Sequence, residues 1–254
     1  MGAEANPRAK HAPAGAAASR VVLVIPTLNE EAAIGPLLAR LPQGAVARVI
    51  VADGGSSDRT VERARAMGAQ VIDAGSGYGR ACWQGALSAG ADCDILVFMD
   101  GDGADNPELI DRLTAPITAG AADFVIGSRL RGRREKGSMS FHQIAAGVVL
   151  GQAMRLAHGV LYTDMCAFRA IKRESLMRLG MREMTYGWNI EMQMRAAAAG
   201  LGILEVPVDY GMREGGVSKV AGSLNGTLRA GSRILTTFFR VWRETRPRGT
   251  ARFG

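Results

Sequence analysis

The sequence predicts an α/β protein with a mostly parallel central sheet in a single domain. Short apolar runs alternate with helical segments, and polar residues directly follow most of these runs. Continuous apolar runs are typical of strands buried on both faces. Their alternation with helices of ten to fifteen residues indicates right-handed βαβ units. The length of 254 residues suits one large domain of this class.

The expected elements follow one another with short connections. We expect strands over residues 20–25, 46–52, 70–73, 95–99, 123–127 and 203–208, with one more short strand after Arg169. We expect helices over residues 29–41, 56–68, 81–90, 107–120, 141–158 and 188–199, and within 223–254.

Apolar spacing, capping residues and glycines indicate the first helices and loops. The helix after residues 20–25 carries apolar residues at i, i+3, i+4 and i+7. Serines can cap the second helix, and Gly68 closes it. The glycine-rich loop at 75–80 comes after the third strand and has the spacing G-x-G-x-G. Because this is not G-x-G-x-x-G and no Walker A sequence occurs, a dinucleotide dehydrogenase and a P-loop NTPase are both disfavoured.

The stretch 95–107 (ILVFMDGDGADNP) is the centre of the predicted site. A buried strand runs into Asp100-Gly101-Asp102, and two carboxylates so close repel each other unless a cation joins them. Mg²⁺ and Mn²⁺ suit such oxygens and usually bind through one or two carboxylates plus substrate phosphates. A simple capped turn is the other interpretation, because Asp-Gly is common in turns. Asn106-Pro107 then starts the next helix.

Polar residues recur where the expected strands end. Open α/β sheets bind ligands outside the carboxyl ends of their strands. We therefore expect one site built from Asn29, Glu30, Asp53, Arg80, Asp100, Asp102, Ser128 and Arg129.

Charge divides the chain into two unlike halves. Residues 1–128 hold 10 Lys/Arg against 15 Asp/Glu, and residues 129–254 hold 21 against 9. An acidic and a basic half suggest a metal on one side and an anion on the other. The loop 210–223 places Arg213, Ser218 and Lys219 among four glycines, a composition that can wrap a phosphate. No recognition-helix, RNP or zinc-finger pattern supports nucleic acid as the anion.

The last expected helix is basic and amphipathic. Its apolar stripe consists of Leu224, Leu228, Gly231, Leu235, Phe238 and Trp242. Such a helix either lies in a membrane interface or packs against the body of the protein, and the sequence leaves both open. No run reaches the ~18 apolar residues of a membrane span. Residues 1–19 read as a flexible tail without a signal-peptide core, and three scattered cysteines read as buried free thiols in a reducing compartment.

Five motifs in order and spacing resemble the family 2 glycosyltransferases of GT-A fold, in particular the polyprenyl (dolichol) phosphate mannosyl- or glucosyltransferases. The resemblance covers about residues 20–222, with 20–128 as the nucleotide-sugar half and 129–222 as the acceptor half. The motifs are residues 22–31 (VLVIPTLNEE), 53–58 (DGGSSD), 100–102 (DGD), 127–129 (GSR) and 164–169 (DMCAFR).

The resemblance implies an inverting transfer from a nucleotide-sugar with Mg²⁺ or Mn²⁺, and it assigns roles by position. Base and ribose would contact Pro26, Leu28, Glu30 and Asp53. Ser56, Arg80 and Gly101 complete the donor site, and Asp100 and Asp102 would hold the metal on the diphosphate. The acceptor phosphate and the diphosphate would be handled by Arg129, Arg213 and Lys219, with Asp102 among the catalytic residues. Ala104 departs from relatives that often have glutamine there as a further metal contact, so Asp105 or water is expected to substitute.

We therefore expect a hexosyltransferase that acts on a polyprenyl phosphate at the cytoplasmic face of an anionic membrane. The same donor chemistry with a soluble hydroxyl acceptor is an alternative, and a non-catalytic nucleotide-sugar-binding protein is another. No nucleic-acid partner is expected, and homo-oligomerisation is left open. For Glu191 a structural salt bridge is preferred over contact with the sugar or a role as base.

Overall fold

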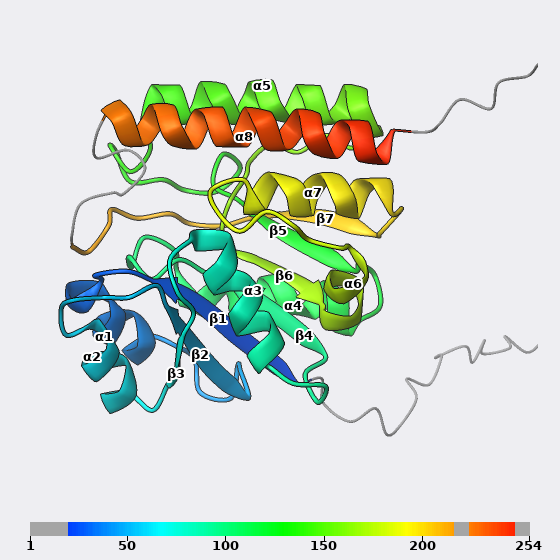
Figure 1. Ribbon diagram of the computed structural model, residues 1–254. Helices are drawn as coiled ribbons and strands as arrows, with labels where there is room; N and C mark the ends of the chain where they lie inside the picture. Colours follow the sequence, from blue (N-terminus) through cyan, green and yellow to red (C-terminus); the bar gives the residue numbers. More distant parts are fainter. Residues whose placement is uncertain (1–19, 216–223, 247–254) are drawn as a thin grey trace, which may run out of the picture.

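The protein is a three-layer α/β structure around one seven-stranded sheet (Figure 1). The computed structural model describes residues 20–215 and 224–246, with the side chains of 224–228 excepted. The strands are β1 (Val21–Thr27), β2 (Arg48–Asp53), β3 (Gln70–Asp73), β4 (Ile95–Phe98), β5 (Phe124–Ser128), β6 (Arg169–Lys172) and β7 (Ile203–Pro207). The helices are α1 (Glu31–Ala39), α2 (Thr60–Ala66), α3 (Tyr78–Ser88), α4 (Ile110–Thr118), α5 (Phe141–His158), α6 (Arg173–Arg178), α7 (Trp188–Ala198) and α8 (Leu224–Thr245), with a 3₁₀ turn at Pro107–Leu109.

The sheet is mixed and mostly parallel, as predicted. Its strand order is β3-β2-β1-β4-β6-β5-β7, and β6 alone runs antiparallel to its neighbours β4 and β5. Every residue of β1 and β4 is buried, which explains their unbroken apolar sequences. Pro207 ends β7 at the edge of the sheet, where proline removes no ladder hydrogen bond that a neighbour needs.

Parallel register brings the polar strand ends together. Thr27 at the end of β1 pairs with Asp53 at the end of β2, and Val24 pairs with Phe98 near the end of β4. The turns after these strands therefore lie at one edge of the sheet, where ligands bind in open α/β folds. The three cysteines are buried and free, as expected.

Helix α3 begins at Tyr78, three residues earlier than the sequence predicts. Gly77 and Gly79 suggest a loop because glycine is a poor helix former. A Cβ on Gly79 would lie 2.5 Å from the carbonyl oxygen of Glu183, and one on Gly77 would lie 2.6 Å from that of Met184. These glycines therefore allow residues 183–184 to approach closely, and Gly79 lies within the helix.

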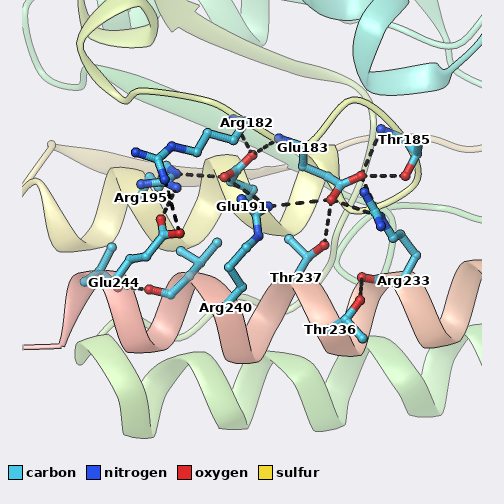
Figure 2. A network of polar contacts seen from close by, with 12 residues as sticks. Arg182, Glu183, Thr185, Glu191, Arg195, Arg233, Thr236, Thr237, Arg240 and Glu244 are labelled. Atoms are coloured by element: carbon cyan, nitrogen blue, oxygen red, sulfur yellow. Dashed lines mark hydrogen bonds and ion pairs between the residues drawn. The ribbon is translucent and has the colours of Figure 1, made fainter.

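Helices α5 and α8 lie side by side over α7, on the side of that helix away from the sheet (Figures 1 and 2). A capping box formed by Ser140 and Gln143 starts α5, and Gly159 in the left-handed conformation ends it. In the described part of α8, Phe238 and Val241 are buried against the protein, whereas Leu235 and Trp242 are exposed.

The helix α8 thus packs against the body, but the predicted stripe is only partly its packing face. Residues outside the stripe complete that face, with Val241 fully buried and Ala230 and Thr237 both 2% exposed. No helix in the described ranges is long and apolar enough to cross a membrane.

Candidate active site

The acidic turn after β4 is held on three sides. The hydroxyl of Tyr78 donates to Oδ1 of Asp100 at 3.0 Å, and Oδ1 of Asp102 accepts the backbone N–H of Ala104 at 3.0 Å. Gly101 lies so close to β1 that a Cβ would stand 2.9 Å from Cγ2 of Thr27. Desolvation and the neighbouring Asp102 raise the pKa of Asp100 to about 6. The two aspartates are thus held in a site where a cation would relieve their repulsion.

Asp105 adds a third carboxylate beside this pair. Its side chain is 2% exposed, and burial followed by the charges of Asp100 and Asp102 raises its pKa well above the usual value. The sequence predicted Asp105 only as a possible metal contact in place of the glutamine that relatives often have at position 104. Its backbone forms a bridge with Tyr210, which brings the loop after β7 to the acidic turn.

Arg213 joins two predicted site residues that are far apart in the sequence. Its Nη1 lies 3.0 Å from Oε1 of Glu30, and its Nη2 lies 3.0 Å from Oδ2 of Asp102. Burial lowers the pKa of Arg213, but the charges of Asp102 and Glu30 outweigh it and leave that pKa raised. The cation expected to handle the acceptor therefore contacts the expected metal ligand directly.

The segment that carries Arg213 is anchored by its backbone. Glu214 donates its N–H to the carbonyl of Asp102 at 2.9 Å, and Gly211 donates to that of Ala104 at 2.8 Å. The predicted Lys219 lies outside the described residues, so its role stays a prediction.

Asp53 organises the turn after β2. Its carboxylate accepts hydrogen bonds from Oγ1 of Thr27 at 3.1 Å, from the N–H of Gly55 at 3.0 Å and from the N–H of Ser56 at 2.7 Å. Leu28 is 38% exposed at the end of β1, whose Pro26 is buried. The structure thus places these four predicted donor-site residues, Pro26, Leu28, Asp53 and Ser56, at two adjacent strand ends. Their contact with a base or ribose stays a prediction.

Arg129 is paired inside the protein. Its Nε and Nη2 lie 2.8 and 2.7 Å from the two carboxylate oxygens of Asp164, and its guanidinium lies over the ring of Tyr210 at 4.9 Å. Such a bidentate pair fixes the arginine firmly. Arg129 is therefore oriented by Asp164 beside the loop that carries Arg213.

Two further residues escaped the sequence reasoning. Tyr78 carried no signal beyond its place in the glycine-rich loop. Arg169 ends the motif at residues 164–169, but the sequence predicted no role for it. In the structure Arg169 is fully buried in β6, and its Nη1 donates to the carbonyl of Asn189 at 3.2 Å. The charge of Asp100 is among the interactions that act on its guanidinium. A buried cation beneath an acidic turn has no pattern in the sequence that would reveal it.

Arg80 has an exposed side chain at the start of α3. Its backbone N–H donates to the carbonyl of Met184 at 2.9 Å. The loop that contains Met184 therefore supports the segment from which both Arg80 and Tyr78 project.

Glu191 has the structural role that the sequence favoured. It is fully buried on α7, where its oxygens accept from Nε of Arg195 at 2.9 Å and from the N–H of Glu183 at 2.6 Å (Figure 2). Arg240 of α8 lies 3.3 Å away. Glu183 in turn accepts from Arg233 at 3.0 Å. This network fastens α8 and the loop before α7 to each other.

A cavity of about 460 Å³ opens beside the acidic turn. Arg133 and Arg134, from the basic sequence 129–136 (RLRGRREK), line it together with Arg40, which directly follows α1. Asp105 and Tyr210 form part of its wall. This basic segment therefore faces the same region as the acidic turn.

The donor set fits a hard divalent cation that arrives with a diphosphate. In the described ranges no three acidic, histidine or cysteine side chains form a complete metal site. Mg²⁺ and Mn²⁺, however, commonly take only one or two carboxylates and complete their shell with phosphates and water. Asp100 and Asp102 have the chemistry of such ligands, and Arg213 contacts Oδ2 of Asp102 in this structure.

Fold and site together define an α/β enzyme with paired aspartates at the carboxyl edge of its sheet. The family model described as glycosyl transferase family 2 matches residues 22–180, and the chain belongs to that family. It is 36% identical over 217 residues to an uncharacterized glycosyltransferase of Mycobacterium tuberculosis, covering 84% of this chain and 95% of the relative.

Relatives with named activities differ in their acceptors. The chain is 30% identical over 221 residues to the polyprenol monophosphomannose synthase of Mycolicibacterium smegmatis, with 80% and 82% of the two chains covered. Among solved structures it resembles glucosyl-3-phosphoglycerate synthase of M. tuberculosis with Mn²⁺, UDP and glucosyl-3-phosphoglycerate. That likeness has a TM-score of 0.70 at 25% identity and covers 92% of this chain and 86% of the other. The predicted GT-A fold and the glycosyltransferase class are thus confirmed.

Proposed function

We propose that this glycosyltransferase moves a hexose, with inversion, from a GDP-mannose or UDP-glucose type donor to a polyprenyl phosphate. The observation that carries the proposal is the contact of Arg213 with Asp102, which places a cation from the acceptor half against the expected metal ligand. Support for a lipid phosphate comes from the 30% identity to two enzymes named for mannosyl transfer to polyprenyl or undecaprenyl phosphate.

The residues of the site divide the work. Asp100 and Asp102 would hold Mg²⁺ or Mn²⁺, which supplies positive charge to the departing diphosphate. Arg213 adds a second cation where negative charge develops. A phosphate acceptor has its second pKa near ~6 and is already anionic at neutral pH. It therefore needs orientation by arginine more than it needs a general base, and no histidine occurs in the site motifs.

A soluble phosphorylated acceptor is the second candidate. It is favoured by the likeness to the glucosyl-3-phosphoglycerate synthase structures, whose ligands include phosphoglyceric acid. The cavity beside the acidic turn, with arginines in its wall, is large enough for a small phosphorylated molecule.

One assay separates the candidates. Release of nucleoside diphosphate is measured from GDP-mannose and UDP-glucose with Mn²⁺, in the presence of polyprenyl phosphate or of 3-phosphoglycerate. The proposal expects turnover with the lipid and none above background with the soluble acid. The reverse result would establish the second candidate instead.

The metal ligands are tested in the same assay. Asp102→Asn should lower turnover at least ~10³-fold, because the diphosphate loses its bridging cation. Asp111→Asn, an exposed change on α4, is the matched control and should keep wild-type turnover. Full activity of Asp102→Asn would refute the metal assignment.

A further inference from the structure

The two outermost helices expose large apolar side chains. On α5, Leu156 is 89% exposed, Phe141 79% and Val149 67%. On α8, Phe239 is 56% exposed and Leu235 52%. Single exposed apolar residues need no explanation, but a group of them on adjacent elements marks an interaction surface.

These side chains lie on the faces turned away from the protein. On α8, Leu235, Phe239 and Trp242 are spaced i, i+4 and i+7, while Thr237 and Val241 of the opposite face are buried. On α5, buried residues such as Gly151 and Met154 likewise lie opposite the exposed ones.

The two exposed faces neighbour each other. Both close and general views place α5 and α8 side by side (Figures 1 and 2). Oγ1 of Thr245 on α8 lies 3.4 Å from Nε2 of His158 on α5. We call the combined outward surface of the two helices the α5–α8 face.

The charge on this face has one sign. Across both helices Glu244 is the single acidic residue, and Arg195 and Arg182 neutralise it at 2.5 and 3.5 Å. Arg155 and Arg243 are exposed beside the apolar side chains. The guanidinium of Arg246 lies 5.7 Å from the ring of Trp242.

Two further arginines of α8 pair with acidic residues of the protein body. Arg233 and Arg240 point inward to Glu183 and Glu191 (Figure 2). The inward arginines fasten the helix, and what faces outward is apolar with a cationic margin.

We propose that the α5–α8 face docks on a membrane interface that contains anionic lipid. Aromatic and leucine side chains would enter the headgroup boundary while arginines contact lipid phosphates. A second copy of the chain fits less well. An isologous contact would bring the exposed arginines of both copies together, with no acidic residue free to pair with them.

This surface deepens the proposed function, because it would bring the active site to a lipid acceptor. Only the biological role of this surface rests on the proposed function. Its binding to vesicles can be measured without donor or acceptor. Failure of vesicle binding and failure of transfer to polyprenyl phosphate are therefore separate results.

The experiment is co-sedimentation of the full chain with vesicles of phosphatidylcholine alone or mixed with phosphatidylglycerol. We expect binding to the mixed vesicles, weakened by salt. Phe239→Ser with Trp242→Ser should reduce the partition coefficient ~10-fold or more. Val149→Ser with Leu156→Ser should do the same, which a membrane role for α8 alone does not predict.

Matched controls use exposed apolar residues elsewhere. Met67→Ser with Leu87→Ser changes residues that are 46% and 44% exposed but distant from both helices in the fold, and should leave binding unchanged. Thermal melts of each variant establish that it is folded. Equal binding of all variants, or no binding of the wild type to mixed vesicles, would overturn the proposal. A stable dimer that the helix variants dissociate would assign the face to a second copy instead.

Discussion

At the scale of single residues, the site depends on contacts that hold two carboxylates near each other. Tyr78, Ala104 and Arg213 each occupy one oxygen of Asp100 or Asp102. The hydroxyl of Tyr78 is the contact that best fixes Asp100, because it comes from the first residue of a helix.

Tyr78→Phe should therefore weaken Mn²⁺ binding in the presence of nucleoside diphosphate by ~10-fold, since Asp100 loses a hydrogen bond worth about 1–2 kcal/mol. Isothermal titration calorimetry gives the affinity directly. Tyr186→Phe, at a tyrosine that is 40% exposed, is the control and should bind Mn²⁺ like the wild type. An unchanged affinity of Tyr78→Phe would mean that the hydroxyl does not position Asp100.

The raised pKa of Asp100 predicts how stability depends on pH. Its folded-state value of about 6 exceeds the ordinary 3.8, so the metal-free protein loses stability as pH rises through this window. Asp100→Asn should then raise the melting temperature at about pH 8, by an amount equivalent to ~3 kcal/mol, and by about half as much at about pH 5. Scanning calorimetry without metal measures both, and an effect of equal size at the two pH values would contradict the argument.

At the scale of elements, the loop of residues 182–187 connects α8 with the start of α3. Glu183 binds Arg233 and Thr237 of α8, at 3.0 Å each, while its neighbour Met184 accepts the N–H of Arg80. The glycines at the start of α3 allow this approach. The C-terminal helix is thereby joined to the segment that carries Tyr78.

Gly79→Ala should destabilise the protein by about 1–3 kcal/mol, because its Cβ would stand 2.5 Å from the carbonyl oxygen of Glu183. Gly35→Ala on α1 is the matched change, with nothing within 4 Å of the added Cβ, and should be neutral or stabilising. Urea denaturation gives both values. Similar stability of the two variants would show that the α3–loop contact tolerates a side chain.

Elements were predictable where one local signal dominated. The continuous apolar sequences of β1 and β4 predicted strands directly. The start of α3 failed because Gly79 serves a distant contact that local propensity does not contain. The sequence left the packing face of α8 open. In the structure Thr237, Arg233 and Arg240 contact Glu183 and Glu191 of other elements, and these distant contacts set the face.

At the scale of the whole molecule, Arg213 closes the two halves of the chain on each other. It reaches Glu30 after β1 and Asp102 after β4 from the loop after β7. The sequence could name all three residues by their motifs. It could not pair them, because 183 positions separate Glu30 from Arg213 and only the tertiary fold brings them within 3.0 Å.

Arg213→Ala should leave the affinity for Mn²⁺ without nucleotide equal or greater, because it frees an oxygen of Asp102. It should lower kcat/KM for the acceptor ~100-fold, because the receiving group and the diphosphate lose a cation. Steady-state kinetics with varied acceptor measure the second effect and calorimetry the first. Arg112→Ala on the exposed side of α4 is the control. A variant with weakened donor binding and normal acceptor kinetics would reverse the assignment of Arg213.

The guanidinium between Glu30 and Asp102 acts as a tethered counterion. Because Arg213 is part of the chain, its charge stays beside Asp102 at any salt concentration. A divalent ion without a bound nucleotide must therefore displace Arg213 from Asp102 with no compensating contact for the arginine. A metal that arrives already bound to a nucleotide brings a diphosphate to which the released arginine can turn. The resting enzyme should therefore ignore free metal and accept the metal–nucleotide complex as a unit.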